Sequence, residues 1–122
     1  MNENEKEIQA QGPQTSVGKS WDVKVKVVYQ KGVCNFGHKV GNEWTVGPTT
    51  PEGICNAAYA AIYPHIRVLQ RGGQYEYPKG SGVCRFCCPD LWNPVVFELS
   101  PVPGTGRKSK PMDPGAGHLE SL

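Results

Sequence analysis

The sequence lacks the long apolar runs that membrane segments need. It contains no stretch of about eighteen consecutive apolar residues, the length that suggests a membrane-spanning helix, and no apolar segment typical of a signal peptide. We therefore expect neither a membrane span nor a secretory leader, and we expect the chain to work in the cytoplasm. The formal net charge is +2, so the charge balance does not favour binding to nucleic acid.

Motifs that carry catalysis are also missing. The sequence has no glycine fingerprint for a dinucleotide, no P-loop and no nucleophile elbow. No pair of carboxylates stands out as an acid and its base. The parts of a self-sufficient enzyme are therefore not visible, and this favours a non-enzymatic, accessory role.

Three segments of the chain differ in composition. Residues 1–19 are polar and nearly free of branched or aromatic side chains, and residues 104–122 are rich in Gly, Pro, Ser and Lys. Neither tail has enough apolar surface to offset the entropy lost on ordering. We therefore expect a single folded core over residues 20–103, flanked by two disordered or extended tails. A core this short is marginally stable alone, so a bound metal or a partner chain would help to stabilise it.

Alternation of apolar and polar residues predicts strands at both ends of this core. Trp21–Tyr29 is the clearest strand, because valine alternates with lysine and the lysines suit a solvated face. Glu43–Val46 predicts a short second strand, and Val95–Leu99 predicts a last one before a Pro-Val-Pro segment. Ile66–Leu69 is a further candidate strand.

One helix is predicted between these strands. Thr50 is a suitable N-cap, and Pro51 fits the first helical position. The apolar residues with helical spacing are Ile54, Ala57, Ala58, Ala61 and Ile62. Pro64 should end the helix near residues 61–63, because a proline ring clashes with the preceding turn. This order of elements predicts an α+β domain in which one helix packs on a small, mostly antiparallel sheet.

Cysteine is the residue type that carries a chemical signal. Three of the five cysteines form the pattern Cys84-x-x-Cys87-Cys88. Two thiols separated by two residues can chelate one metal through a tight turn. Cytoplasmic thiols stay reduced, so clustered cysteines there favour metal or redox chemistry over structural disulfides. The odd number of cysteines also argues against complete pairing in disulfides.

The other two cysteines lie upstream in separate segments. Cys34 is followed four residues later by His38, which is within chelating range, and Cys55 lies in the second turn of the predicted helix. We interpret these segments as converging on one metal site. Its candidate ligands are Cys34, His38, Cys55, Cys84, Cys87 and Cys88. The last two are adjacent, so in an extended segment one would face the site and the other the core.

Several alternatives stay open at this point. His38 can equally be a solvated loop histidine. Cys34 and Cys55 can be ordinary small buried residues. The site would then consist of the three downstream cysteines, Cys84, Cys87 and Cys88. Thiolates with one imidazole suit either zinc or an iron–sulfur cluster. A further alternative is a thiol-based redox or metal-trafficking protein, in which the three downstream cysteines would react reversibly.

The core also resembles a family of small, uncharacterised, cysteine-containing proteins found mainly in anaerobic bacteria and archaea. The resemblance covers nearly all of residues 21–99. The segments that carry it are Cys34-x-x-Gly-His-Lys-Val-Gly41, Thr50-Pro-Glu-Gly-Ile-Cys55, Leu69-Gln-Arg-Gly-Gly73, Cys87-Cys-Pro-Asp90 and Asn93-Pro-Val-Val-Phe-Glu-Leu99. In that family the cysteines that match Cys34, Cys55 and Cys88 recur, whereas one at Cys87 is variable. Cys84 and both tails are additions in this chain, so the resemblance implies a three-cysteine site without Cys84.

The family occurs in oxygen-poor settings, and this favours an iron–sulfur cluster as the expected metal group. We therefore expect a small metal-binding protein that carries an iron–sulfur cluster, with the 4Fe-4S type favoured and a zinc ion as the alternative. Three thiolates would leave one cluster iron open, or filled by His38 or Cys84. Without catalytic motifs, the protein would serve as an accessory or electron-transfer partner of a larger enzyme. A structural zinc module for protein interaction is the alternative function.

Overall fold

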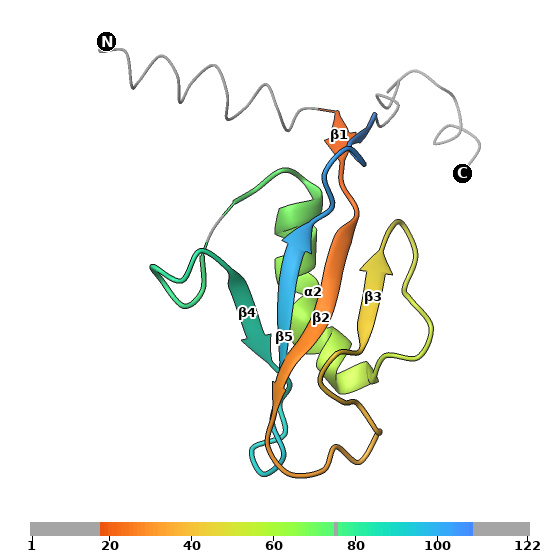
Figure 1. The fold of residues 1–122 in the computed structure, drawn as a ribbon. Coiled ribbons are helices and arrows are strands. Elements are labelled where there is room, and N and C mark those ends of the chain that lie inside the picture. Colours follow the sequence, from red (N-terminus) through yellow and green to blue (C-terminus); the bar gives the residue numbers. More distant parts are fainter. Residues whose placement is uncertain (1–17, 75, 109–122) are drawn as a thin grey trace, which may run out of the picture.

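The computed structural model describes residues 18–74 and 76–108. Within them there are one helix and six strands, and the strands form two antiparallel sheets (Figure 1). The elements in chain order are β1 (Lys19–Ser20), β2 (Val23–Gln30), β3 (Glu43–Val46), α2 (Asn56–Gln70), β4 (Cys84–Cys87), β5 (Val95–Pro101) and β6 (Arg107–Lys108). The α+β class predicted from the sequence is confirmed.

The larger sheet has four strands in the order β3-β2-β5-β4, and neighbouring strands are antiparallel. β2 and β5 form its centre and pair along most of their lengths, from Val23 opposite Pro101 to Gln30 opposite Val95. β3 lies beside β2, and β4 lies beside β5. The two-stranded sheet of β1 and β6 lies beyond one end of the larger sheet (Figure 1).

One face of the larger sheet packs against α2. The alternation in β2 places Val23, Val25 and Val27 on this face, and all three side chains are fully buried. The residues that pack around them are Ala58, Ile62, Ile66 and Leu69 of α2 and Val95, Phe97 and Leu99 of β5. A large apolar side chain contributes about 1.5–3 kcal/mol when fully buried. This helix–sheet interface is therefore the main source of stability.

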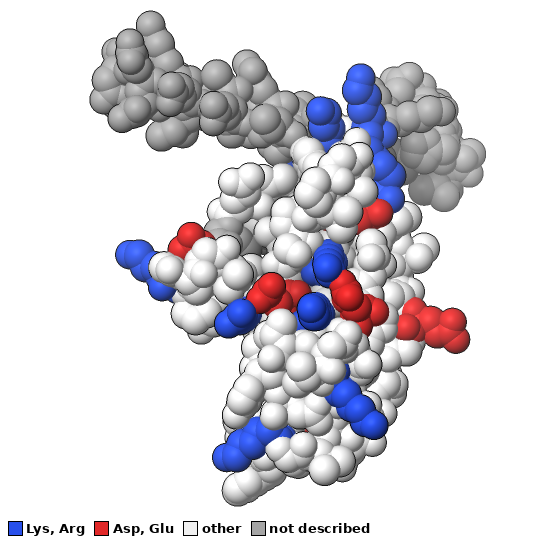
Figure 2. Space-filling view, viewed as in Figure 1, with Lys and Arg blue, Asp and Glu red and all other residues white. Residues whose placement is uncertain are grey.

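The opposite face of the sheet is charged, as the lysine alternation in β2 predicts. Lys24 Nζ lies 2.7 Å from a Glu43 carboxylate oxygen, and Arg85 Nη2 lies 2.9 Å from a Glu98 carboxylate oxygen. Figure 2 shows basic and acidic side chains interleaved across this face. Exposed cross-strand pairs are worth about 0.2–1 kcal/mol each, so they support the strand register more than they add stability.

The helix differs from the prediction at both ends. It begins at Asn56 instead of directly after Thr50, and it passes through Pro64 to end at Gln70. The strand predicted at Ile66–Leu69 is therefore wrong, because these residues form the last turns of α2.

Burial explains why Pro64 does not end the helix. A proline inside a helix costs about 3 kcal/mol. Beyond it, Ile66 and Leu69 continue the apolar stripe and are 0% and 3% exposed, which contributes about 1.5–3 kcal/mol for each. The gain from packing therefore outweighs the cost of the proline. The chain leaves the helix at Gly72, whose φ of +85° suits glycine.

The cysteine-rich segment forms a strand and not the tight turn through which Cys84 and Cys87 could chelate one metal. Cys84–Cys87 is β4, at the edge of the larger sheet. Tyr77 covers part of its free side. The amide of Tyr77 donates to the carbonyl of Val83 at 2.9 Å, and its carbonyl accepts from the amide of Arg85 at 2.7 Å.

The strands β1 and β6 extend past the predicted core of residues 20–103. They pair with each other, and Arg107 of β6 forms an ion pair with Asp22 at 2.7 Å. The rest of the predicted tails, residues 1–17 and 109–122, lies outside the described residues. In the part of the chain that is described, no helix is long and apolar enough to cross a membrane.

Replacing Pro64 with Ala should stabilise the protein, because it removes a helix-interior proline and leaves the buried stripe intact. The free energy of unfolding, measured by chemical denaturation, should rise by about 1–3 kcal/mol. Pro103→Ala is the control, because this proline lies in a turn, where losing the ring should be neutral or destabilising. A lower unfolding midpoint for Pro64→Ala would contradict this account of the helix.

Candidate functional site

Two loops and the start of α2 meet at one end of the larger sheet (Figure 1). Because Gln30 pairs with Val95, the end of β2 lies beside the start of β5. The β2–β3 loop (residues 31–42) and the β4–β5 loop (residues 88–94) therefore leave the sheet together. Each loop carries a cysteine, and a third cysteine immediately precedes α2.

A cavity of about 290 Å³ lies between these three segments. Cys34, Cys55 and Cys88 all line it, one from each segment. The three residues are half-buried, and their thiols are not in disulfides. Ala58 and Val95 provide apolar parts of the wall. The fold thus brings together three thiols that are far apart in the sequence.

Hydrogen bonds hold the β2–β3 loop against the β4–β5 loop. The amide of Lys31 donates to the carbonyl of Pro94 at 3.0 Å, and the amide of Val33 donates to Oδ1 of Asn93 at 3.3 Å. Gly32, between the two donors, has a φ of +70°, and a Cβ there would overlap the Asn93 side chain. A glycine at this position therefore allows the two loops to approach closely.

The β4–β5 loop is shaped by Asp90. Its Oδ1 accepts hydrogen bonds from the amides of Trp92 at 2.9 Å and Asn93 at 3.0 Å, which is the Asx-type turn that an aspartate favours. At the start of the loop, the amide of Cys88 donates to the carbonyl of Val95 at 2.9 Å. The amide of Val95 donates in return to the Cys88 Sγ at 3.3 Å. These bonds fix the position of the Cys88 sulfur.

His38 links the β2–β3 loop to the start of α2. Its Nε2 accepts a hydrogen bond of 3.1 Å from the amide of Cys55, the N-cap residue of the helix. The residue is 4% exposed, and its ring centroid lies 4.7, 5.1 and 6.0 Å from those of Phe36, Trp44 and Phe97. Burial lowers the pKa of His38 below its usual value. The ring is therefore neutral at pH 7, with its proton on Nδ1.

This hydrogen bond uses the lone pair of His38 Nε2. The nitrogen would have to release the Cys55 amide before it could bind a metal. The interpretation of His38 as a solvated loop histidine is wrong, because the ring is buried among aromatic side chains. Its role as an anchor has no signal in the sequence, since the partner amide lies 17 positions away.

Cys84 and Cys87 are not among the residues that line this cavity. Residues three positions apart in a strand point to opposite faces. Cys84 is 3% exposed and belongs to the core, whereas Cys87 is exposed. Partial desolvation, followed by the effect of the adjacent Cys88 thiol, raises the pKa of Cys87. The Cys87 side chain is therefore a protonated thiol at neutral pH.

The three cavity cysteines do not form a compact coordination group. Among residues 18–74 and 76–108, no three His, Cys, Asp or Glu side chains are placed so that they could hold a metal ion. No protein-family model matches the chain, and no curated protein or solved structure is significantly similar to it. The resemblance to a cysteine-containing family stays a prediction.

The buried His38 should make the fold less stable in acid. Because its pKa is lowered in the folded protein, the unfolded chain binds this proton more readily. The contribution of neutral His38 to stability is complete above its unfolded pKa of 6.5 and is lost as the pH falls from there toward the lowered value. His38→Gln keeps an acceptor but cannot titrate. It should reduce the loss of unfolding free energy between about pH 7 and about pH 5, measured by urea denaturation.

His65→Gln is the matched control for this experiment. Burial lowers the pKa of His65 as well, so part of the acid sensitivity should persist in His38→Gln and should decrease further in the double variant. A pH profile that is the same in His38→Gln and the wild type would show that His38 is not a source of the acid sensitivity.

Proposed function

We propose that the protein binds an iron–sulfur cluster through Cys34, Cys55 and Cys88 and serves as an accessory or electron-transfer partner of a larger enzyme. The observation that carries the proposal is the cavity itself, which thiols from three separate segments line together. Cysteine thiolates are the usual ligands of such clusters, and a bound cluster would supply one-electron transfer.

A cluster and a single zinc ion need different spacings between their ligands. Ligands about 2.3 Å from one tetrahedral zinc lie about 3.8 Å from one another, so a zinc site is compact. The described residues contain no such compact group. The thiolates of a 4Fe-4S cluster bind different irons, so their sulfurs surround a larger guest. The cavity of about 290 Å³ between the three half-buried cysteines leaves room for such a guest.

Backbone amides around the cavity suit a guest with negative charge. α2 starts there without a side-chain cap and without an acidic residue in its first turn, so its first amides and its dipole can stabilise an anionic group. The amide of Val95 donates to the Cys88 sulfur, and hydrogen bonds to sulfur tune the reduction potential of clusters. Cys84 and His38 are engaged elsewhere, so the fourth iron would be left for an external ligand.

The two loops beside the cavity expose large apolar side chains, which supports a protein partner. Leu91 and Trp92 of the β4–β5 loop are 89% and 85% exposed, and Val33 and Phe36 of the β2–β3 loop are 76% and 55% exposed. Exposed apolar residues gathered in one region are typical of protein interaction surfaces. An enzyme that docks on these loops would lie next to the cavity, at the short range that electron transfer requires.

Reversible disulfide chemistry at the downstream cysteines has less support. A disulfide requires Cβ atoms about 3.5–4.5 Å apart. Cys84 and Cys87 point to opposite faces of β4, so a bond between them would require the strand to unpair from β5.

Single substitutions should separate the cysteines that bind the cluster from the others. After reconstitution with iron and sulfide without oxygen, the wild type should bind both elements and absorb visible light. Cys34→Ser, Cys55→Ser and Cys88→Ser should each lose most of the iron and the stability that it adds, because metal binding is coupled to folding. Elemental analysis with visible absorbance is the measurement.

Cys84→Ala and Cys87→Ser are the matched controls and should retain the iron content of the wild type. Alanine is used at Cys84 because a serine hydroxyl in the core would need a hydrogen-bond partner. A colourless protein with one zinc per chain would contradict the cluster and support the alternative function, a structural zinc module. Equal iron contents in all five variants would contradict the assignment of the site.

A further inference from the structure

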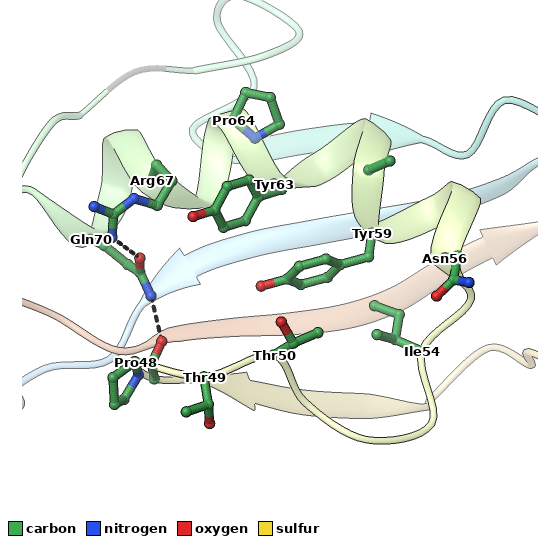
Figure 3. A pocket seen from close by; sticks show the side chains of 12 residues that line it. Pro48, Thr49, Thr50, Ile54, Asn56, Tyr59, Tyr63, Pro64, Arg67 and Gln70 are labelled. Carbon is green, nitrogen blue, oxygen red and sulfur yellow. Dashed lines mark hydrogen bonds between the residues drawn. The ribbon is translucent and has the colours of Figure 1, made fainter.

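A second cavity, larger than the first, lies between α2 and the segment that follows β3. Its volume is about 560 Å³, within the range of about 300–1,000 Å³ that is usual for small-molecule sites. Figure 3 shows its side chains. Its lining includes side chains of α2 (Tyr59, Tyr63, Arg67 and Gln70) and of the segment after β3 (Pro48, Thr50 and Ile54).

Gln70 forms the fixed end of this second cavity. It is 3% exposed, and its Nε2 donates to the carbonyl of Gly47 at 2.8 Å. Its Oε1 accepts a hydrogen bond of 2.8 Å from Nη1 of Arg67. Both bonds are visible in Figure 3. Because the amide is buried and bonded on both sides, it holds one arm of the guanidinium group in place.

Arg67 brings a positive charge to this end of the second cavity. Among the described residues, no carboxylate forms an ion pair with it. The ion-paired cations there are Lys24, Arg85 and Arg107. Its hydrogen bond to Gln70 goes to a neutral amide and uses one of five N–H donors. The remaining donors can bind a ligand, and a guanidinium fork matches carboxylate and phosphate oxygens.

Two tyrosines complete the second cavity. Figure 3 shows the hydroxyls of Tyr59 and Tyr63 pointing toward the end where Arg67 and Gln70 lie. Burial raises the pKa of Tyr59, and a hydrogen bond with the Thr50 side chain partly opposes the rise, so its phenol stays protonated at neutral pH. The two rings lie 5.5 Å apart and are tilted by 37°. They offer flat apolar surface beside the donors.

We propose that the second cavity binds a small organic anion, with a carboxylate or phosphate-monoester head and a flat apolar body. The head would be bound by Arg67 and the tyrosine hydroxyls, and the body would lie against the tyrosine rings, Ile54 and Pro48. The cysteine cavity plays no part in this argument, so the two proposals can fail separately.

Titration of ¹⁵N-labelled protein with phenyl phosphate and with phenylacetate tests this proposal. At least one probe should bind saturably and shift the amide signals of the second half of α2 and of the residues around Gly47. Inorganic phosphate has the head without the body, and benzyl alcohol has the body without the anionic head. Each should bind about tenfold more weakly or worse, because it makes half of the contacts.

Variants of the second cavity assign the contacts. Arg67→Gln should weaken binding about tenfold or more, because charge-assisted hydrogen bonds are lost. Arg67→Lys keeps the charge but not the fork, so its loss should be smaller. Tyr63→Phe should also show a small loss. Arg85→Gln is the matched control, since this arginine is already paired with Glu98 on the opposite face of the sheet, and it should bind as the wild type does.

The tighter of the two probes identifies the head group as phosphate or carboxylate. The proposal is overturned if neither probe binds, or if inorganic phosphate or benzyl alcohol binds as tightly as the tighter of them. It is also overturned if a folded Arg67→Gln binds as tightly as the wild type. Should Arg67→Gln not fold, unchanged affinity in both Arg67→Lys and Tyr63→Phe would overturn it instead.

Discussion

The pairing of β2 with β5 is the constraint on which both the sheet and the cysteine cavity depend. Its register sets Gln30 opposite Val95, and the contact continues beyond the strands through Val33 and Asn93, which are 60 positions apart. A shift by one residue would turn the valines of β2 toward solvent. It would also displace Cys34 relative to Cys88. The burial that stabilises the sheet therefore also positions the thiols.

Elements with a strong local pattern could be predicted from the sequence. The alternation of valine and lysine identified β2, and Glu43–Val46 matches β3 at both ends. The expectation that distant cysteine segments meet agrees with the cavity for Cys34, Cys55 and Cys88. The reason is that two of them adjoin paired strands and the third begins the helix that covers the sheet.

Elements that depend on distant partners could not be predicted. Pro64 is a local stop signal, but burial of Ile66 and Leu69 outweighs it. The Cys84-x-x-Cys87 spacing suits a tight turn. These residues are extended instead, because they pair with Phe97 and its neighbours in β5. His38 anchors the start of α2 through a bond that no sequence spacing encodes. In each case, packing or pairing with another element decides the outcome, and the local sequence does not.

The borders of the larger sheet have a consequence for assembly. Unpaired strand edges recruit strands from other chains, and natural proteins cover or shorten them. Here Tyr77 occupies part of the free side of β4, and the border on the other side is β3, with four residues, one of which, Glu43, is held in an ion pair. Growth by strand addition is therefore hindered at both margins. A complex that includes this domain would form through its loops or its faces.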